Sequence, residues 1–268
     1  MDYELLDSGD EKKLEQFGPY RLIRPCPQAI WKPAHPKKWE SHHGEFIRDP
    51  KNRWKNQKLP AFWTITYEKL QFKLVPTSFG HLGLFPEHAV HWKWMEKQVK
   101  KEKGAVLNLF AYSGGATLSL AKKGISLCHV DSSKGMVAWA RENSALNQLE
   151  NASIRWIVDD AMQFLKREAK RGVTYQGILL DPPSFGRGSK GQVFKIEKDL
   201  LPLLELCAQV VLPNGFIVLS AHTPGITSTV LRHMLSQTQK KGKIEGGEMV
   251  IPSDDFDLPS GCFARWHG

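Results

Sequence analysis

The segment DPPSF, residues 181–185, carries side chains that could hold a polar substrate group for reaction. Pro182 and Pro183 fix the backbone and have no N–H of their own, so backbone carbonyls and the Asp181 carboxylate can point at one place as acceptors. Phe185 then offers a flat surface on which a flipped base could stack. An acceptor pair beside an aromatic platform favours an exocyclic amine as the group held there. A rigid turn with a buried Phe185 is the alternative.

A second segment, NLFAYSGG at residues 108–115, has the small residues of a ligand-binding turn. Ala111, Ser113, Gly114 and Gly115 let the backbone turn tightly and approach a ligand closely. The segment lacks the G-x-G-x-x-G spacing that seats a pyrophosphate on a helix N-terminus. The sequence of this loop is therefore only modest evidence for another adenosine ligand over a dinucleotide.

Acidic residues follow two further predicted strands. A carboxylate at Asp131 could accept hydrogen bonds from both ribose hydroxyls of an adenosine ligand. A capping aspartate before the next helix is the alternative. Asp160, followed by Ala161, could accept from the adenine exocyclic amine, and Asp159 is expected to be a solvated residue at the start of a helix.

Short apolar segments alternate with amphipathic ones beyond Gly104, and this order must position the loops above. The pattern predicts strands over 105–110, 126–131, 153–158, 175–180 and 215–221, and helices over 115–124, 132–149, 160–172 and 198–211. Such alternation is typical of an α/β fold, a parallel sheet with helices on both faces. Ligands of open parallel sheets bind beyond the carboxyl ends of the strands, where all these loops lie.

The N-terminal part of the chain has a different composition. Residues 1–20 are charged without a sustained apolar period, which predicts a flexible N-terminus. Residues 21–62 are rich in prolines and basic residues, which favours extended backbone, and four tryptophans (Trp31, Trp39, Trp54 and Trp63) lie in or directly after this stretch. The tryptophans could pack a small core or stack bases, and core packing is favoured. Strands are expected over 62–76 and a helix over 88–104, giving a small β-rich region at 21–100 and an α/β domain at 101–268.

The net charge and the positions of the cysteines restrict the possible functions. The net charge is +9, and residues 21–58 hold ten Lys or Arg against three Asp or Glu, which suits a polyanionic partner such as RNA. The four cysteines lie far apart without C-x-x-C pairing, which argues against disulfides or a zinc site. The acidic amino terminus is not a secretory signal, and no apolar run is long enough for a bilayer. We expect a cytoplasmic protein with no membrane contact; the oligomeric state stays open.

From about Arg21 onward, the chain resembles the bacterial class I S-adenosylmethionine-dependent methyltransferases related to the 23S ribosomal RNA enzymes. The matching motifs are GHLGLFPE (80–87), NLFAYSGG (108–115), HVDSSKG (129–135), DDA (159–161), DPPSFGRG (181–188) and LSAHTPG (219–225). The resemblance implies a Rossmann-like seven-stranded sheet, S-adenosylmethionine as cofactor and RNA as partner. It assigns cofactor binding to Phe85, Ala111, Tyr112, Ser113, Gly114, Asp131, Ser132, Asp160, Ala161 and Asp181. It assigns the methyl-acceptor position to Asp181, Pro182, Pro183 and Phe185.

One departure concerns the atom methylated. Relatives that methylate cytosine at carbon 5 use a cysteine thiolate, which falls roughly where this chain has Ala221–His222–Thr223. Carbon-5 transfer is therefore disfavoured, and a base nitrogen is preferred. His222 could be a base or a structural residue. No metal site is expected, because His81, His88 and His91 have no nearby acids at ligand spacing.

Other functions remain as alternatives. These are RNA cytosine-C5 methylation, methylation of a small molecule, and RNA binding without catalysis on a methyltransferase scaffold. A nicotinamide-dependent oxidoreductase is the rival outside this class, and the missing G-x-G-x-x-G and the presence of DPPSF count against it.

Overall fold

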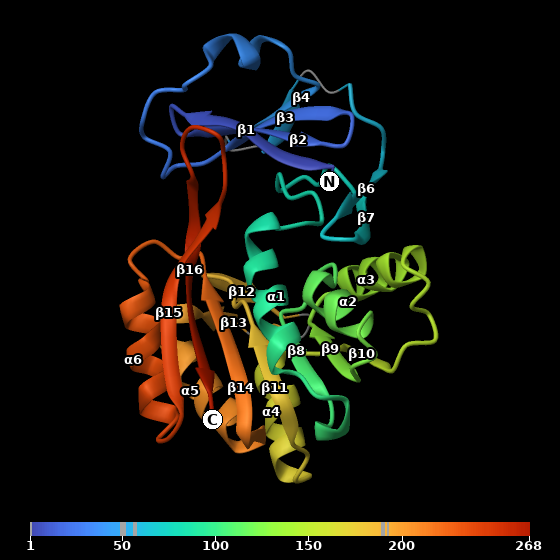
Figure 1. Cartoon of the computed structure of the whole chain (residues 1–268), viewed down its shortest axis with the longest axis vertical. Helices are drawn as coiled ribbons and strands as arrows, with labels where there is room; N and C mark the ends of the chain where they lie inside the picture. The colour runs from blue at the N-terminus through green and yellow to red at the C-terminus, as the bar shows by residue number, and fades with distance from the viewer. Residues whose placement is uncertain (1, 49–51, 56–57, 189–190, 192) are drawn as a thin grey trace. The chain divides into compact units, whose positions relative to one another are not determined.

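A computed structural model describes residues 2–268, apart from 49–51, 56–57, 189–190 and 192. The chain divides into two compact units (Figure 1). Unit 1 comprises the residues up to Glu87 together with Val250–Ser260, and unit 2 comprises His88–Met249 together with Gly261–Gly268. In the part of the chain that is described, no helix has the length and apolar character needed to cross a membrane.

Unit 2 is built on a seven-stranded sheet in the order β10-β9-β8-β11-β14-β16-β15. Five strands run parallel to their neighbours, and β16 pairs antiparallel with β14. The strands are β8 (Val106–Leu109), β9 (Leu127–Asp131), β10 (Ile154–Val158), β11 (Tyr175–Leu180), β14 (Val211–Ala221), β15 (Lys243–Ile251) and β16 (Leu258–His267). The strand order reverses between β8 and β11, which is where doubly wound sheets bind ligands. The predicted Rossmann-like α/β fold is confirmed.

Helices cover both faces of this sheet (Figure 1). Helices α1, α2 and α3 pack in sequence order on one face, and α4, α5 and α6 pack on the other. Their bounds are α1 (Ala89–Gln98), α2 (Gly115–Ala121), α3 (Lys134–Leu146), α4 (Ala161–Lys170), α5 (Ile196–Val210) and α6 (Ser228–Thr238). Between β11 and α5, β12 (Phe185–Arg187) and β13 (Val193–Lys195) form a small antiparallel pair.

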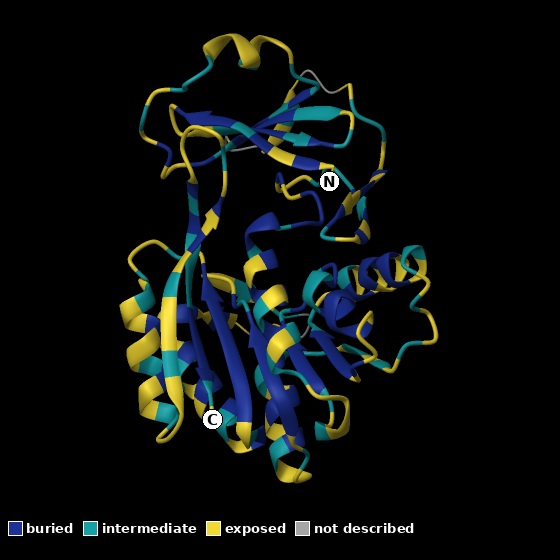
Figure 2. Ribbon diagram, in the orientation of Figure 1, coloured by how far each residue is buried: buried dark blue, intermediate teal, exposed yellow. Residues whose placement is uncertain are grey.

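The central strands are buried on both faces, as Figure 2 shows in dark blue. Successive strand side chains point to opposite faces. Leu107 and Leu109 therefore join the core beneath α4 and α5, whereas Asn108 bonds to Thr117 of α2 on the other face. Burial on both sides explains why these strands read as continuous apolar runs.

The predicted helix over 88–104 is shorter in the structure. Helix α1 ends at Gln98, and a 3-10 turn, η3 (Lys101–Lys103), follows. The Gln176 side chain of β11 accepts from the Lys100 backbone N–H and donates to the Lys100 carbonyl, both at 2.9 Å. These bonds replace the ones that would continue the helix.

Unit 1 contains a five-stranded sheet, a two-stranded hairpin and a short 3-10 turn, η1 (Pro36–Glu40), and a second 3-10 turn, η2 (Pro86–His88), contains the boundary between the units in the sequence. The sheet strands are β1 (Tyr3–Gly9), β2 (Lys12–Phe17), β3 (Tyr20–Pro25), β4 (Gly44–Ile47) and β5 (Arg53–Lys55), and the hairpin strands are β6 (Trp63–Tyr67) and β7 (Leu70–Leu74). The prediction that residues 1–20 are flexible is wrong, because β1 and β2 lie in this sheet. Buried polar residues, notably Asp7 and Glu15, interrupt the apolar period that would have revealed these strands.

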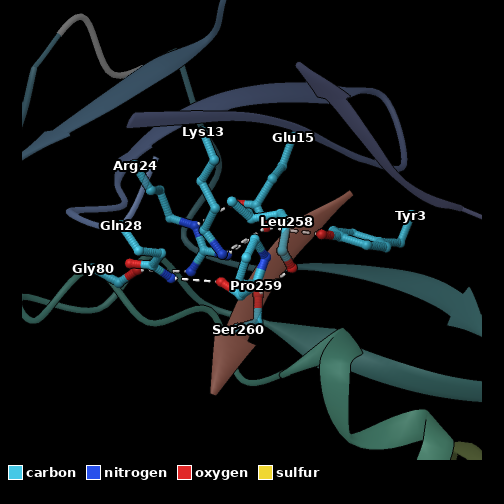
Figure 3. Close-up of polar contacts among 9 residues, drawn as sticks. All are labelled: Tyr3, Lys13, Glu15, Arg24, Gln28, Gly80, Leu258, Pro259 and Ser260. Atoms are coloured by element: carbon cyan, nitrogen blue, oxygen red, sulfur yellow. Dashed lines mark hydrogen bonds and ion pairs between the residues drawn. The ribbon is translucent and has the colours of Figure 1, made fainter. Parts of the chain in front are cut away.

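Glu15 is the centre of a buried polar cluster in unit 1 (Figure 3). Arg24 donates to both Glu15 carboxylate oxygens, at 2.7 and 2.9 Å, and Tyr3 donates to one of them at 3.0 Å. Lys13 lies 3.1 Å from the same carboxylate. Arg24 also donates to the Gly80 carbonyl at 3.1 Å. The cluster therefore ties the start of the GHLGLFPE segment to the sheet.

The four tryptophans of 21–63 are part of this architecture. Trp63 is buried, and the other three are half-buried. Each indole N–H donates within unit 1, to the Ser8 carbonyl, the Asp7 carboxylate, the Thr77 carbonyl and the Phe17 carbonyl for Trp31, Trp39, Trp54 and Trp63 respectively. The predicted packing role is confirmed.

The division into units differs from the predicted one. The boundary lies at Glu87–His88 rather than near residue 100, and Val250–Ser260 return to unit 1. Side-chain contacts inside unit 1 hold that return segment. His35 lies 2.7 Å from the Asp255 carboxylate, Trp31 contacts the Phe256 ring, and Gln28 donates to the Pro259 carbonyl.

Candidate active site

The loop after β8 has an unusual backbone. Phe110 and Tyr112 adopt positive φ angles of 53° and 49°, and Gly114 has φ of 91°. Non-glycine residues rarely hold this conformation, which occurs in turns and is also found at functional sites. A side chain at Gly114 would be strained in this region and would lie 3.1 Å from the Ala140 Cβ. Gly114 is therefore required for both the turn and the packing against α3.

Hydrogen bonds fix this loop at the carboxyl edge of the sheet. The Tyr112 N–H donates to Asp131 Oδ2 at 2.9 Å, and Asn143 of α3 donates to the Ser113 carbonyl at 2.9 Å. The Ala111 N–H donates to the Val130 carbonyl. The predicted residues Ala111 and Ser113 are buried, and Tyr112 is half-buried against Trp139.

Asp131 ends β9 and keeps acceptor capacity toward the outside of the loop. Its carboxylate accepts from the Tyr112 and Ser133 backbone N–H groups, each at 2.9 Å. A carboxylate has about four lone-pair sites, so about two remain for further donors. Burial raises the pKa of Asp131, while the two backbone N–H groups oppose that shift. Ser133, rather than Asp131 or Ser132, caps α3.

The two aspartates after β10 differ from the prediction. Asp160 is the N-cap of α4, and its Oδ1 accepts from the Gln163 N–H at 2.9 Å. Asp159 is not the solvated helix-start residue that we expected, because its carboxylate is paired with Arg167. The capping bond uses one oxygen of Asp160 and leaves the other for a ligand amine. Binding of adenine by Asp160 stays a prediction.

A pocket at the ends of β9 and β10 brings several predicted residues together. Asp131, Ser132, Asp160 and Ala161 all line it, and so does Pro183 of the DPPSF segment. The sequence did not predict its other lining residues, which are Phe110, Val130, Asp159, Gly186, Arg187, Gly188 and Phe194. Phe110 and Phe194, with ring centroids 5.5 Å apart, supply an apolar wall. Carboxylates and aromatic rings that line one pocket are groups suited to a nucleoside.

The DPPSF segment follows β11 directly. Asp181 accepts from the Ser220 hydroxyl at 2.7 Å, and Pro182 is buried. Phe185 is not the buried residue of the alternative interpretation, because it is 51% exposed. The Arg187 guanidinium lies 5.8 Å from the centre of its ring. The exposed ring leaves a surface on which a base could stack.

Two histidines that are distant in sequence lie against Asp181. His88 Nε2 is 3.3 Å from Asp181 Oδ2, and His222 Nε2 is 3.5 Å from Asp181 Oδ1. Burial alone would raise the pKa of Asp181, but His88 and His222 hold it well below its usual value. The sequence pattern predicted no acidic partner for His88, but the structure places Asp181, directly after β11, beside it.

Phe85 lies in unit 1, where its ring contacts that of His81 at 5.3 Å. Its role in covering the cofactor stays a prediction.

Comparison with known proteins agrees with this geometry. Residues 30–243 match the family model described as S-adenosylmethionine-dependent methyltransferase. A crystal structure of the SAM-dependent methyltransferase from Agrobacterium tumefaciens matches with a TM-score of 0.95 and 37% identity, covering 100% of this chain and 90% of that one. The crystal structure of SMU.776 complexed with SAH shares the fold with a TM-score of 0.80 at 21% identity, covering 99% of this chain and 75% of that one.

Curated relatives are similar over a shorter region. The ribosomal RNA large subunit methyltransferase K/L of Shewanella sp. (strain MR-4) is 33% identical over 192 residues, which is 70% of this chain and 25% of the relative. The Shewanella oneidensis protein of the same name is 32% identical over 191 residues, again 70% and 25%. The chain thus spans about a quarter of the length of these relatives. It belongs to the family of S-adenosylmethionine-dependent methyltransferases, and its cofactor is S-adenosylmethionine.

Asp131 offers a direct test of the prediction that this pocket binds the cofactor. We expect Asp131→Ala to weaken S-adenosylmethionine binding by about 1.5–3 kcal/mol, or roughly 10- to 150-fold, because hydrogen bonds to a charged group are lost. Isothermal titration calorimetry measures this, with circular dichroism to verify folding. Glu150→Ala, at an exposed position beyond α3, is the matched control. An unchanged affinity in folded Asp131→Ala would remove Asp131 from the site.

Proposed function

We propose that this protein transfers a methyl group from S-adenosylmethionine to a base nitrogen of RNA, with ribosomal RNA as the first candidate, in the cytoplasm. One observation carries the proposal. Pro183 of the DPPSF segment lines the same pocket as Asp131 and Asp160, so the candidate acceptor segment borders the candidate nucleoside pocket.

The cofactor supplies an activated methyl group, and the chain must supply position. Asp181 and the Pro182 carbonyl would accept the hydrogens of an exocyclic amine, so that the nitrogen lone pair faces the methyl group. The low pKa of Asp181 keeps its carboxylate charged, and the Ser220 hydroxyl fixes its orientation. Phe185 would stack on the flipped base. No covalent bond between enzyme and base is needed for a nitrogen acceptor.

The four cysteines support nitrogen over carbon 5. Cys26, Cys128 and Cys207 are buried, and burial raises the pKa of each thiol, to about 11 for Cys128. Cys262 is opposite Ala221 in the β14–β16 pair, but its thiol donates to the Ile226 carbonyl and its pKa is also raised by burial. A thiol with a raised pKa is a weak nucleophile at neutral pH.

RNA as the substrate class rests on the names of the curated relatives and on the basic residues of 21–58. A direct experiment is transfer of labelled methyl groups to ribosomal RNA from cells lacking the gene, followed by nucleoside analysis. We expect a base methylated at nitrogen. A product methylated at cytosine carbon 5 would contradict the nitrogen assignment, and labelling of metabolites without RNA would contradict the RNA assignment.

The basic residues of unit 1 are expected to make RNA affinity salt-dependent, because phosphate contacts release counterions. Exposed Lys37, Lys38, Arg53 and Lys55 are the positions to test. Changing all four to Glu should lower RNA affinity by at least tenfold in a filter-binding assay and leave S-adenosylmethionine affinity unchanged. Salt-independent RNA binding by the parent protein, or none, would favour a small-molecule substrate, and equal binding by the variant would remove these four residues from the RNA interface.

A further inference from the structure

Three side chains of unit 2 converge at the carboxyl edge of the sheet. His88 immediately precedes α1, Asp181 immediately follows β11, and His222 immediately follows β14. The two imidazole Nε2 atoms are 3.3 Å apart, and each lies 3.3 or 3.5 Å from an oxygen of the Asp181 carboxylate. Among the residues that the structure describes, this is the one group of three such side chains whose ligand atoms lie within 4.8 Å of one another.

These separations are long for hydrogen bonds. A charge-assisted N–H···O bond usually measures about 2.7–2.9 Å. Ligand atoms at about 2.0–2.1 Å from a tetrahedral zinc ion are about 3.4 Å apart, because the edge of a tetrahedron is about 1.6 times its centre-to-corner distance. The nitrogen–nitrogen distance of 3.3 Å matches that spacing, and the nitrogen–oxygen distances of 3.3 Å to Asp181 Oδ2 and 3.5 Å to Asp181 Oδ1 are close to it. Two ring nitrogens that face each other also need a cation or a proton between them.

The surroundings orient the three groups. The Ser220 hydroxyl donates to Asp181 Oδ1 at 2.7 Å, which is the kind of outer hydrogen bond that fixes a ligating carboxylate. The His88 side chain is 13% exposed, that of Asp181 27% and that of His222 37%, so the cluster is partly enclosed yet open to solvent on one side. A metal site with three protein ligands and one open position has this character.

We propose that His88, Asp181 and His222 bind a divalent transition metal of the zinc class through two imidazole nitrogens and one carboxylate, with a coordination position open to solvent. The sequence predicts no metal site, since His88 and His222 are 134 residues apart and Asp181 belongs to a motif with another assigned role. The inference goes beyond the proposed function, which needs no metal.

The metal and the amine of the proposed function would compete for Asp181. We therefore expect zinc to lower methyl transfer to RNA. That expectation rests on the proposed function, whereas metal binding does not, so a binding assay tests the metal site even if no RNA is methylated.

The test is a zinc titration of the full chain after chelator treatment, monitored by competition with a chromophoric chelator. We expect one equivalent of zinc to bind. His222→Ala and Asp181→Asn should each weaken binding at least tenfold. His233→Ala, exposed on α6, is the matched control and should bind as the parent does. Cobalt(II) in place of zinc should give the visible absorption of a tetrahedral site in the parent and in His233→Ala only.

Two results would overturn the proposal. One is parent protein that binds no zinc at micromolar concentration. The other is zinc bound equally by the parent and by a His88→Ala/His222→Ala double variant whose circular dichroism and S-adenosylmethionine affinity match the parent.

Discussion

Replacing Asp181 with alanine should lower turnover by about two to three orders of magnitude or more, while S-adenosylmethionine affinity stays within a few-fold of the parent. Loss of one preorganised hydrogen-bonding group at a reacting centre has a cost of about 10²–10³ in rate. Asp181 lies at the carboxyl end of β11, where Ser220 orients it, and its low pKa keeps it ionised at neutral pH. Single-turnover methyl transfer measured alongside cofactor titration separates these two effects.

Control variants show whether the loss of turnover is specific to Asp181. Glu205→Gln, at an exposed position of α5, should have parental turnover. Each of the four cysteines changed to Ser should also leave turnover within about a few-fold, because no thiol is needed for nitrogen transfer. A folded but inactive cysteine variant, or a covalent adduct with RNA containing 5-fluorocytosine, would contradict the nitrogen assignment and favour carbon-5 methylation. Cys262, which is opposite Ala221, is the first cysteine to examine.

Changing Arg24 to Met should destabilise unit 1 by about 3–5 kcal/mol, the usual cost of removing one partner of a buried ion pair. Glu15 is fully buried, and Arg24 donates to both of its oxygens. The variant would leave that carboxylate with Tyr3 and Lys13 alone. Urea denaturation monitored by tryptophan fluorescence measures the effect, since Trp63 lies in the same unit.

Lys32→Met is the control, because the Lys32–Asp10 pair is 88% and 55% exposed and should not change stability measurably. A double variant Glu15→Leu/Arg24→Met should recover much of the lost stability by removing the unpaired charge. Equal stability of Arg24→Met and the parent would refute the structural role of the pair.

The Glu15–Arg24 pair also makes the stability of unit 1 depend on pH. Burial would raise the pKa of Glu15, but Arg24 and Lys13 lower it from 4.5 to about 2. A lowered pKa means that the stabilisation is complete above about pH 4.5 and is lost as the pH falls toward 2. Over that range the parent should lose up to about 3 kcal/mol through Glu15. The Glu15→Leu/Arg24→Met variant should lack this component.

The sequence predicted the parallel part of unit 2 closely, because those strands are buried on both faces and their helices have clear caps and ends. It missed β15 and β16, and it misassigned β1 and β2. In β1 and β2 the inward positions include Asp7 and Glu15, whose charges are satisfied by partners that come from other parts of the chain. A residue pattern cannot show that a charged side chain will be buried when its partner is not adjacent.

Site residues could be predicted where an acidic residue lies at the end of a predicted strand. Asp131 and Asp160 were chosen for that reason, and both line one pocket with Pro183. Phe110 and Phe194 were not chosen, because an apolar residue in or directly after a strand cannot be distinguished from a core residue by sequence alone. The approach of His88 and His222 to Asp181 depends on three separate segments meeting, which only the tertiary structure reveals.

The return of Val250–Ser260 to unit 1 bears on how the protein is synthesised. The residues up to Glu87 are synthesised well before this segment, so unit 1 remains incomplete until Val250–Ser260 have been made. The sheet of unit 2 is also incomplete until β16 has been made, because β16 lies between β14 and β15 but follows both of them in the sequence. A stop codon before residue 250 would therefore remove part of both units. An isolated N-terminal fragment would lack part of its own fold.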